Sequence, residues 1–297
     1  MNAEDIAAAV AEHFPAAEVR AVQRLEGGVS AQVFRIDLRL ADSTDQAVVL
    51  RAMGKSGLES AQEHALLTAL YDAGLPVPRP LCFDASCSHV DAAYVLMDFA
   101  EGSSEVTKES AGSQIGRMAE TLVTIHQTPT ALLPPLPSRL DPVPELLGFL
   151  PDGVEWRALR DFCAALESRP FDGAPVLLHG DLWPRNLLWQ DGRVVAILDW
   201  EDAALGDPLS DVACALLELR YIFDDVLVDR FQATYSRHAS VDTHRLALWQ
   251  IYVASAAQHY MGAWGLEPSR EAHMRQIALE HIRAAAVVLG VGDSALG

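Results

Sequence analysis

The sequence predicts an α+β protein with a small β-rich N-terminal lobe, residues 1–100, and a larger helical C-terminal lobe, residues 101–297. Up to residue 100 the chain has mostly short apolar runs rich in β-branched residues, bounded by turn residues. Beyond residue 109 apolar residues recur mainly at helical spacing. With 297 residues and 50% hydrophobic content, the chain can bury one large core or two modest ones.

The first lobe is expected to alternate strands with single helices. Residues 3–14 have apolar side chains at helical spacing, and residues 25–35 contain a glycine pair flanked by alternating apolar residues, which suggests two strands joined by a tight turn. Residues 47–51 and 94–99 have the composition of strands. Between them, a helix from about residue 58 to residue 73 is ended by Gly74 and Pro76.

The second lobe is expected to be helical, with one exception. The predicted helices are 109–127, 155–168, 208–220, 225–238, 243–264 and 269–289. Five prolines between residues 134 and 144 predict a loop, and residues 176–200 are strand-like around an Asp191-Gly192 turn.

Charge and composition exclude several classes of function. A net charge of −19 argues against a nucleic-acid partner, which needs a basic surface, but it suits a cationic substrate. The four cysteines lack metal or disulfide spacing. No apolar run approaches the roughly 18 residues of a membrane span, and the N-terminus carries acid where a signal peptide has base. We therefore expect a soluble, cytoplasmic protein.

The chemistry is concentrated in residues 178–189, with the sequence LHGDLWPRNLLW, and in Ile197–Trp200. Phosphoryl transfer needs a carboxylate near the attacking hydroxyl and oxygen ligands for the magnesium on the phosphates. Asp181 and Asn186 lie five residues apart in a loop interrupted by Pro184. Such a loop can direct both side chains into one cleft.

The Asp191-Gly192 turn predicts where Asp199 lies. In a two-residue hairpin Gln190 pairs with Arg193, and continuous pairing places Asn186 opposite Ile197. Asp199 is then a diagonal neighbour of Asn186, about 7–8 Å away. An amide oxygen and a carboxylate at this distance could share one magnesium ion.

These motifs, with Gly206-Asp207-Pro208 and Asp211 downstream, resemble the aminoglycoside phosphotransferase family over residues 20–290. The resemblance implies a two-lobed protein-kinase-like fold, Mg²⁺, and ATP or GTP as phosphoryl donor to a small-molecule hydroxyl acceptor. It implies that Asp181 is the catalytic aspartate and that Asn186 and Asp199 are the magnesium ligands. Asp207 and Asp211 are implied to support the catalytic loop, and we expect His179 to brace it by hydrogen bonds.

The N-terminal lobe matches the family in part. Gly28 and Ser30 resemble its nucleotide-positioning loop. The strand that carries lysine in the kinase template ends here in Arg51, with Glu63 as the expected helix partner. We expect Arg51 to replace the lysine, with Lys55 a weaker candidate, although the two residue types are not interchangeable. Backbone groups of Asp98 and Ala100 are the implied nucleobase contacts.

The acceptor is expected to bind to the helical lobe. The candidate residues are Trp183, Glu218, Tyr221, Asp224, Tyr252 and Tyr260. An aromatic stripe that includes Tyr252, His259 and Tyr260 would favour a bulky, partly apolar acceptor such as a macrolide, unless it is core packing. Acidic residues 224–225 would favour an amine-bearing sugar.

Several activities remain compatible with these residues. The short interval between Asp199 and Gly206 excludes the activation loop of protein kinases, and Gly180 and Trp200 disfavour choline kinase proper. An antibiotic O-phosphotransferase (aminoglycoside or macrolide) conferring antibiotic resistance, and a metabolic kinase of fructosamine, homoserine or amino-alcohol type, fit equally. The third alternative is a non-catalytic nucleotide-binding pseudokinase.

Overall fold

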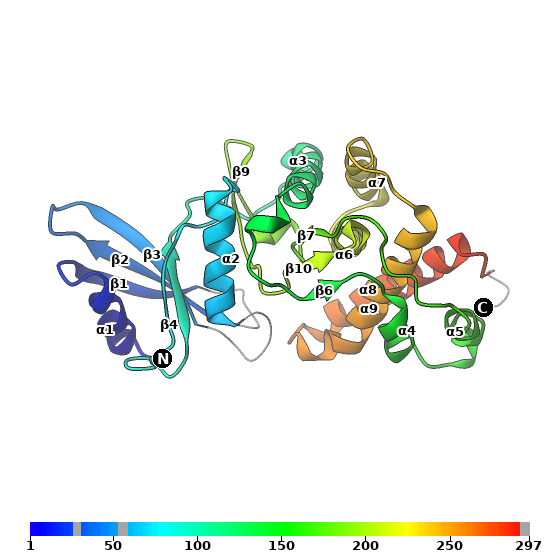
Figure 1. Cartoon of the computed structure of the whole chain (residues 1–297), viewed down its shortest axis with the longest axis horizontal. Coiled ribbons are helices and arrows are strands. Elements are labelled where there is room, and N and C mark those ends of the chain that lie inside the picture. Colours follow the sequence, from blue (N-terminus) through cyan, green and yellow to red (C-terminus); the bar gives the residue numbers. More distant parts are fainter. Residues whose placement is uncertain (26–30, 53–58, 292–297) are drawn as a thin grey trace. The chain divides into compact units, whose positions relative to one another are not determined.

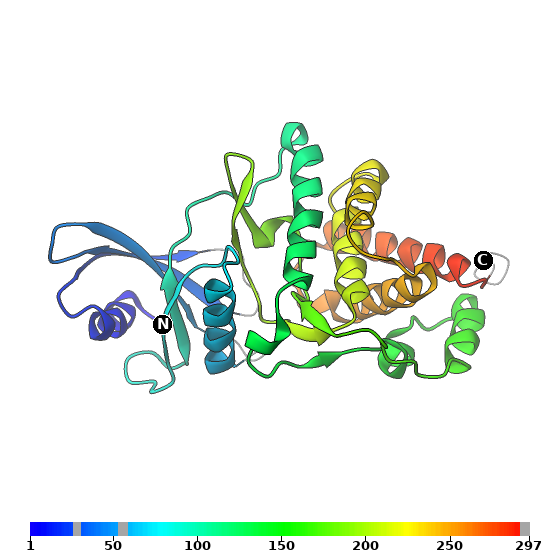
Figure 2. The same cartoon turned by 45° about the horizontal axis from the view of Figure 1, so that its top comes forward.

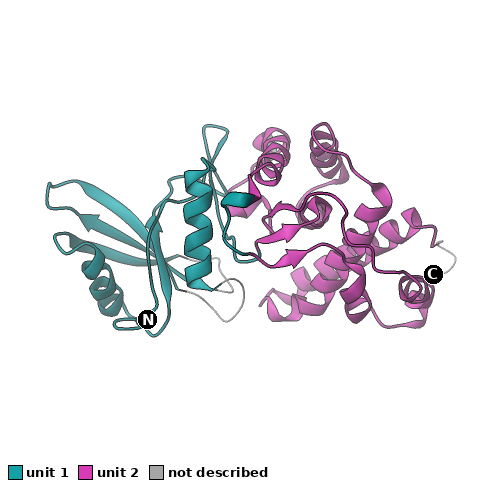
Figure 3. Cartoon of the chain, in the orientation of Figure 1, with its two compact units in different colours: residues 1–104, 131–135, 187–202 teal, residues 105–130, 136–186, 203–297 magenta. Residues whose placement is uncertain are grey.

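The computed structural model describes residues 1–25, 31–52 and 59–291. The chain forms two compact units (Figure 3), the first made of residues 1–104, 131–135 and 187–202, and the second of residues 105–130, 136–186 and 203–297. Compared with the division at residue 100 expected from the sequence, two later segments join the β-rich unit. One of them, 187–202, contains Asp199.

The first unit is built on an antiparallel five-stranded sheet in the order β1-β2-β3-β5-β4 (Figure 1). Its strands are β1 (Glu18–Leu25), β2 (Gln32–Arg39), β3 (Asp45–Ala52), β4 (Pro80–Asp84) and β5 (Tyr94–Asp98). Alternate residues of β2 are buried, as expected for a strand with one face on a core. The sequence predicted β2, β3 and β5 but not β4, a short strand that begins with proline.

Two helices complete this unit. Helix α1 (Ala3–His13) buries Ile6 and Val10 in the same hydrophobic core as β2, β3 and β5. Helix α2 (Ser60–Asp72) packs against β4 and β5 and carries Glu63 in its first turn. Both helices lie close to the predicted ranges.

A separate hairpin in the first unit joins β8 (Leu187–Gln190) to β9 (Arg193–Ile197). Asp191 and Gly192 have φ angles of 50° and 71°, as a two-residue type I′ turn requires. The predicted turn and the Gln190–Arg193 pair are therefore confirmed. The predicted pairing of Asn186 with Ile197 is wrong, because a bulge near Trp189 shifts the register and places Leu187 opposite Ile197.

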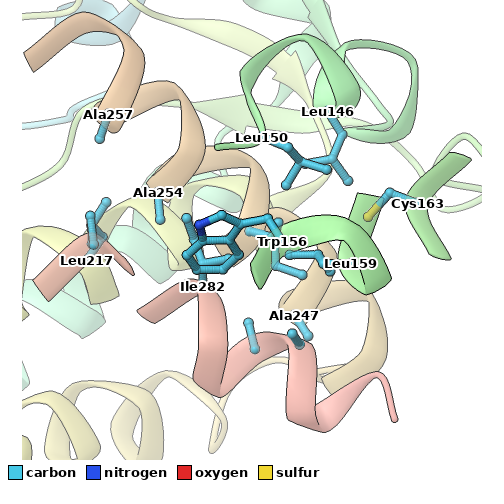
Figure 4. Packing of buried hydrophobic residues seen from close by; sticks show 14 of the residues in the cluster. Leu146, Leu150, Trp156, Leu159, Cys163, Leu217, Ala247, Ala254, Ala257 and Ile282 are labelled. Atoms are coloured by element: carbon cyan, nitrogen blue, oxygen red, sulfur yellow. The ribbon is translucent and has the colours of Figure 1, made fainter. Parts of the chain in front are cut away.

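The second unit is mainly helical (Figures 1 and 2). Its helices are α3 (Lys108–His126), α4 (Val143–Phe149), α5 (Arg157–Ala164), α6 (Pro208–Arg220), α7 (Asp225–Tyr235), α8 (Thr243–Tyr260) and α9 (Pro268–Val288). Its core gathers side chains from α4, α5, α6, α8 and α9 around the buried indole of Trp156 (Figure 4). This second core is separate from that of the first unit.

Helix α4 lies in the region that the sequence predicted to be a loop. Pro142 is its N-cap residue and Pro144 lies in its first turn, where proline is tolerated because the N–H group it lacks has no partner within the helix. The predicted helix 243–264 is also shorter than expected, because a 3₁₀ turn, Met261–Ala263, follows α8.

Three short strands in the second unit lead to the candidate site. They are β6 (Ser138–Arg139), β7 (Val176–Leu178) and β10 (Ala204–Gly206), in the order β6-β10-β7. A Cβ atom at Gly206 would overlap the carbonyl group of Arg139, so this close pairing requires glycine. The chain leaves β7 at Leu178 and enters the loop that carries Asp181.

In the described ranges 1–25, 31–52 and 59–291, none of the helices combines the length and the apolar character needed to cross a lipid bilayer.

Candidate active site

The loop that carries Asp181 is held by a buried carboxylate from helix α6. Asp211 accepts hydrogen bonds from the backbone N–H groups of His179 (2.7 Å) and Gly180 (2.9 Å). Gly180 has a φ of 87°, a left-handed conformation that favours glycine. Regular elements position the residues of these hydrogen bonds. Asp211 lies in the first turn of α6, and His179 directly follows the last residue of β7. The loop therefore has a defined conformation just before Asp181.

Asp211 has a further partner that the sequence analysis did not identify. The Nε2 atom of His126, at the end of α3, lies 3.3 Å from Asp211, and its Nδ1 atom lies 2.9 Å from the hydroxyl group of Tyr235 on α7. Burial alone would raise the pKa of Asp211, but hydrogen bonds and charge from His126 and the His179 N–H outweigh it and hold that pKa below its ordinary value. Asp211 is therefore ionised at neutral pH.

Asp207 anchors the start of α6. Its carboxylate accepts a hydrogen bond from the Leu209 N–H group (3.0 Å), which makes it the helix N-cap. It also accepts hydrogen bonds from the guanidinium group of Arg245 and from the indole N–H of Trp249 (2.6 Å), both on α8. Asp207 thus ties two helices together from a fully buried position.

Asp181 and Asn186 lie side by side in the loop. The Nδ2 atom of Asn186 donates to the carbonyl oxygen of Asp181 (2.8 Å) and to its carboxylate (3.2 Å). The Asn186 amide is fixed with its nitrogen toward Asp181 and its Oδ1 atom turned away. Pro184 begins the 3₁₀ turn that ends at Asn186 and brings the two side chains together.

In the first unit, Arg51 joins three carboxylates. Its Nη1 atom donates to Glu63 (2.6 Å), and its Nη2 atom donates to both Asp199 and Glu201 (2.8 Å each). The ion pair between Arg51 and Glu63 expected from the sequence is present. The bond to Glu201 was not expected, since the sequence left that residue between a supporting role and solvent.

Asp199 combines strain with partial burial. Its φ of 62° is left-handed, an uncommon conformation for a non-glycine residue, and strained residues of this kind cluster at functional sites. Burial raises the pKa of Asp199 above its ordinary value, and Arg51 opposes this effect. The next residue, Trp200, is buried, and its indole N–H donates to the Ile197 carbonyl (3.2 Å), which fixes the segment.

The predicted nucleobase contacts lie at the end of β5. The Asp98 N–H group donates to the Arg79 carbonyl (2.9 Å), and the Phe99 N–H group donates to the Ala47 carbonyl (3.1 Å). The Asp98 side chain accepts a hydrogen bond from Gln46 (3.1 Å). Ala100 follows directly, beyond the strand. Gly28, Ser30 and Lys55 lie outside the described residues.

Two acceptor candidates, Glu218 and Tyr221, lie on the same face of α6 as Asp211. Burial and the negative charge of Asp181 raise the pKa of Glu218 to about 8, which shows that the two carboxyl groups interact. The Tyr221 side chain is buried, and its hydroxyl group has no hydrogen-bond partner among the described residues. Because buried polar groups are nearly always hydrogen-bonded, this hydroxyl group is open to a partner from outside the chain, such as water or a ligand.

The other acceptor candidates have structural partners. Asp224 is the N-cap residue of α7, and Tyr252 donates its hydroxyl hydrogen to Glu145 (2.8 Å). Tyr252 and Tyr260 both have ring centroids 5.7 Å from that of Phe149, which makes them part of an aromatic cluster. The Arg185 guanidinium lies 5.8 Å from the centroid of the half-buried Trp183.

The residues that sequence reasoning missed are His126 and Tyr235, and it left the role of Glu201 open. His126 is 85 residues from Asp211, and Glu201 is 150 residues from Arg51, so no local spacing indicates these contacts. One sequence feature could have indicated the contact of Glu201 with Arg51. Glu201 lies two residues after Asp199, in a chain where arginine replaces the strand lysine.

The sequence is similar to a family of phosphotransferases and to parts of larger proteins. The sequence model described as the phosphotransferase enzyme family matches residues 21–249. Viomycin phosphotransferase from Streptomyces vinaceus is 40% identical over 73 residues, which are 23% of this chain and 25% of that protein. Acyl-CoA dehydrogenase family member 11 from Gallus gallus is 27% identical over 179 residues, 52% of this chain and 22% of that protein. The matched part is thus a quarter or less of these two relatives.

Solved structures match nearly the whole chain. A thermostable mutant of aminoglycoside phosphotransferase APH(4)-Ia, in a ternary complex with AMP-PNP and hygromycin B, has a TM-score of 0.68 at 16% identity, covering 95% of this chain and 99% of that chain. Choline kinase LicA from Streptococcus pneumoniae has a TM-score of 0.66 at 19% identity, covering 95% and 98%. At these identities the similarity establishes the fold, and it confirms the kinase-like fold class expected from the sequence.

Proposed function

The chain belongs to the phosphotransferase enzyme family, and we propose that it is a small-molecule kinase, which transfers the γ-phosphoryl group of ATP or GTP to an acceptor hydroxyl group. The observation that carries this proposal is the pairing of Asp181 with Asn186 in a loop held by the buried Asp211. That arrangement keeps the Asp181 carboxylate in a fixed place.

Asp181 is the proposed catalytic residue. It accepts or orients the proton of the acceptor hydroxyl group as the phosphoryl group is transferred. Positioning dominates this chemistry, because the transferred phosphoryl group needs in-line placement more than it needs a strong base. The hydrogen bonds that Asp211 accepts from the backbone N–H groups of His179 and Gly180, immediately before Asp181, supply that positioning.

Asn186 and Asp199 are the proposed magnesium ligands, and both fit that ion chemically. Mg²⁺ prefers carboxylate and amide oxygens, and the Asn186 amide is turned with its nitrogen toward Asp181 and its oxygen away. Among the described residues no three His, Cys, Asp or Glu side chains form a metal cluster by themselves. Phosphate oxygens of a bound nucleotide would supply further ligands, as in nucleotide-dependent transferases, where magnesium offsets the phosphate charge.

The nucleotide is proposed to bind to the first unit. Backbone groups of Asp98 and Ala100 would contact the base, and Gly28, Ser30 and Arg51 with Glu63 would face the phosphates. The ternary complex of the aminoglycoside phosphotransferase with AMP-PNP supports a nucleotide donor for this fold. We place this activity in the cytoplasm, where nucleoside triphosphates are abundant.

The acceptor is proposed to be an antibiotic with a free hydroxyl group, of aminoglycoside or macrolide type. The hygromycin B complex and the similarity to viomycin phosphotransferase support this class. Glu218 and Tyr221 are the acceptor contacts that the structure supports best, since one interacts with Asp181 and the other has an unpaired buried hydroxyl group.

A second candidate acceptor is a metabolic hydroxyl compound. The observation that favours it is the similarity to acyl-CoA dehydrogenase family members, which extends over half of this chain. A segment similar to this chain within a protein named for acyl-CoA chemistry suggests a hydroxylated acyl compound as acceptor, beside the fructosamine, homoserine and amino-alcohol classes.

The test is a phosphorylation screen with both nucleotides and magnesium. The acceptors are aminoglycosides, macrolides, amino alcohols, ketosamines and hydroxyacyl thioesters, and the product is detected by mass spectrometry. For the acceptor found, Asp181→Asn is expected to lower kcat by about 10²–10⁴-fold while nucleotide affinity changes little. Asp191→Asn, the same change in the exposed turn of β8 and β9, is the matched control and should leave kcat intact.

Phosphorylation of a metabolic acceptor alone would eliminate the resistance hypothesis. Magnesium-dependent nucleotide binding without turnover on any acceptor, and without slow hydrolysis, would favour the non-catalytic alternative. Equal kcat values for wild type and Asp181→Asn would contradict the catalytic assignment.

A further inference from the structure

The contacts of Arg51 define a group of side chains, here called the Arg51 cluster, that consists of Arg51, Glu63, Asp199 and Glu201. The three carboxylates approach the guanidinium from two sides, Glu63 at Nη1 and the other two at Nη2. All four residues belong to the first unit. The arginine and Glu63 are almost completely buried, whereas the side chains of Glu201 and Asp199 retain 16% and 33% of their exposure. Asp199 is therefore the member most open to a ligand.

The cluster has excess negative charge. Three ionised carboxylates and one guanidinium sum to −2. The Oε2 atom of Glu63 is also buried without a hydrogen-bond partner among the described residues. A divalent cation near Asp199 would balance this charge.

The Nη2 atom of Arg51 contacts both Asp199 and Glu201. This sharing limits how strongly Arg51 holds Asp199. The Nη2 atom lies 2.8 Å from Asp199 and 2.8 Å from Glu201, so its two N–H groups are divided between the two carboxylates and only one is directed to Asp199. If Glu201 lost its charge, the guanidinium would interact more strongly with Asp199. A carboxylate fully paired with a guanidinium is a poorer ligand for a metal ion.

We propose that Glu201 is a positioning residue, which shares Arg51 with Asp199 and thereby keeps the Asp199 carboxylate available to magnesium. The inference rests on the proposed function, because it assigns Glu201 a role at the proposed magnesium ligand. It also explains the arginine on β3. A forked guanidinium can contact carboxylates at two nitrogen atoms simultaneously, whereas a lysine ammonium is a single point of charge.

The first experiment measures ADP affinity with and without magnesium by calorimetry. In wild type, magnesium is expected to strengthen ADP binding. In Glu201→Gln, which keeps the size of the side chain and one acceptor oxygen, that enhancement should fall about tenfold, as for other residues that orient metal ligands. Metal-free ADP affinity should stay within about twofold. Asp191→Asn is the matched control, since it removes one negative charge from the same segment, residues 187–202, at an exposed position, and it should behave as wild type.

The kinetic readout separates positioning from direct catalysis. In Glu201→Gln the magnesium concentration for half-maximal rate should rise about tenfold, while kcat at saturating magnesium stays within about twofold of wild type. A large loss of kcat that excess magnesium does not restore would overturn the proposal, because it would make Glu201 a participant in the reaction itself.

The second experiment needs neither nucleotide nor metal. Arg51→Lys, Glu201→Gln and the double variant are compared with wild type by urea unfolding. The two changes should be non-additive, with Glu201→Gln having a smaller effect when lysine replaces the arginine. Additive effects would overturn the inference, since they would show that Arg51 and Glu201 are not coupled.

The outcomes also separate this inference from the proposed function. A wild-type protein without magnesium-dependent ADP binding would overturn both. A wild-type protein that binds with magnesium dependence, together with a Glu201→Gln variant that binds equally, would overturn the role of Glu201 alone.

Discussion

Three residues on one face of helix α6 and its C-cap have different roles in the candidate site. Asp211 supports the loop, and Glu218 and Tyr221 follow at intervals of seven and three residues, so all three lie on one side of the helix. Asp211 has a lowered pKa and Glu218 a raised one. The difference follows from their partners, because Asp211 accepts several hydrogen bonds whereas Glu218 lies near the negative charge of Asp181.

The raised pKa of Glu218 predicts a specific pH dependence of stability. In the folded protein the pKa is about 8, first because of burial and then because of Asp181, whereas the ordinary value is 4.5. Between these pH values the folded protein binds a proton that the unfolded chain has lost. The free energy of unfolding contributed by this group therefore decreases as the pH rises from about 4.5 to about 8.

Glu218→Gln should reduce that decrease, because glutamine does not ionise. The measurement is urea unfolding of wild type and variant at several pH values between 5 and 9, with the difference between them attributed to this group. Glu280→Gln, an exposed position on α9, is the control and should leave the wild-type slope unchanged. A Glu218→Gln variant with the wild-type slope would show that Glu218 ionises normally.

At the scale of elements, much of the fold follows from sequence signals. The Asp191-Gly192 turn, helices α1, α2, α3, α6 and α9, and the Arg51–Glu63 ion pair agree with local pattern and spacing. The bulge in β8 and β9 does not, since it lies beside Trp189, which also exchanges backbone hydrogen bonds with the distant Ser103. Residues such as His126 and Glu201 acquire their partners only through folding, which joins segments far apart in the chain.

Two aspartate N-caps, one buried and one exposed, allow the effect of burial on the stability contributed by a helix cap to be measured. Asp207 caps α6 and Asp224 caps α7, and each accepts a hydrogen bond from a backbone N–H group of its helix. Asp207 is also buried and accepts hydrogen bonds from Arg245 and Trp249. Its removal would leave the Trp249 indole N–H group without its acceptor and the Arg245 guanidinium without its carboxylate, with only backbone carbonyl groups of the described residues as acceptors.

We expect Asp224→Ala to lower the free energy of unfolding by about 1 kcal/mol, the usual effect of losing a cap. Asp207→Ala should lower it by about 3–5 kcal/mol, the range for breaking a buried ion pair. Urea unfolding at neutral pH measures both. Similar losses for the two variants would show that the contacts to α8 contribute little beyond the cap.

At the scale of the whole molecule, charge is the dominant feature. The chain carries 41 acidic and 22 basic side chains other than histidine, which gives −19 at neutral pH. Excess charge of one sign favours solubility but destabilises a compact chain through repulsion, because unfolding separates the charges.

Exposed charges of the same sign repel one another and destabilise the folded protein. Because salt screens this repulsion, the protein should be more stable at high salt. Raising potassium chloride from about 0.01 M to about 1 M shortens the Debye length from ~30 Å to ~3 Å, which screens the surface but affects buried groups much less. We therefore expect the melting temperature at pH 7.5 to rise with salt. The control is the same titration near pH 4.8, the isoelectric point, where net repulsion vanishes and the rise should be much smaller. An equal rise at both pH values would mean that salt acts through surface hydration rather than charge, and a fall at pH 7.5 would mean that attractive ion pairs outweigh the net repulsion.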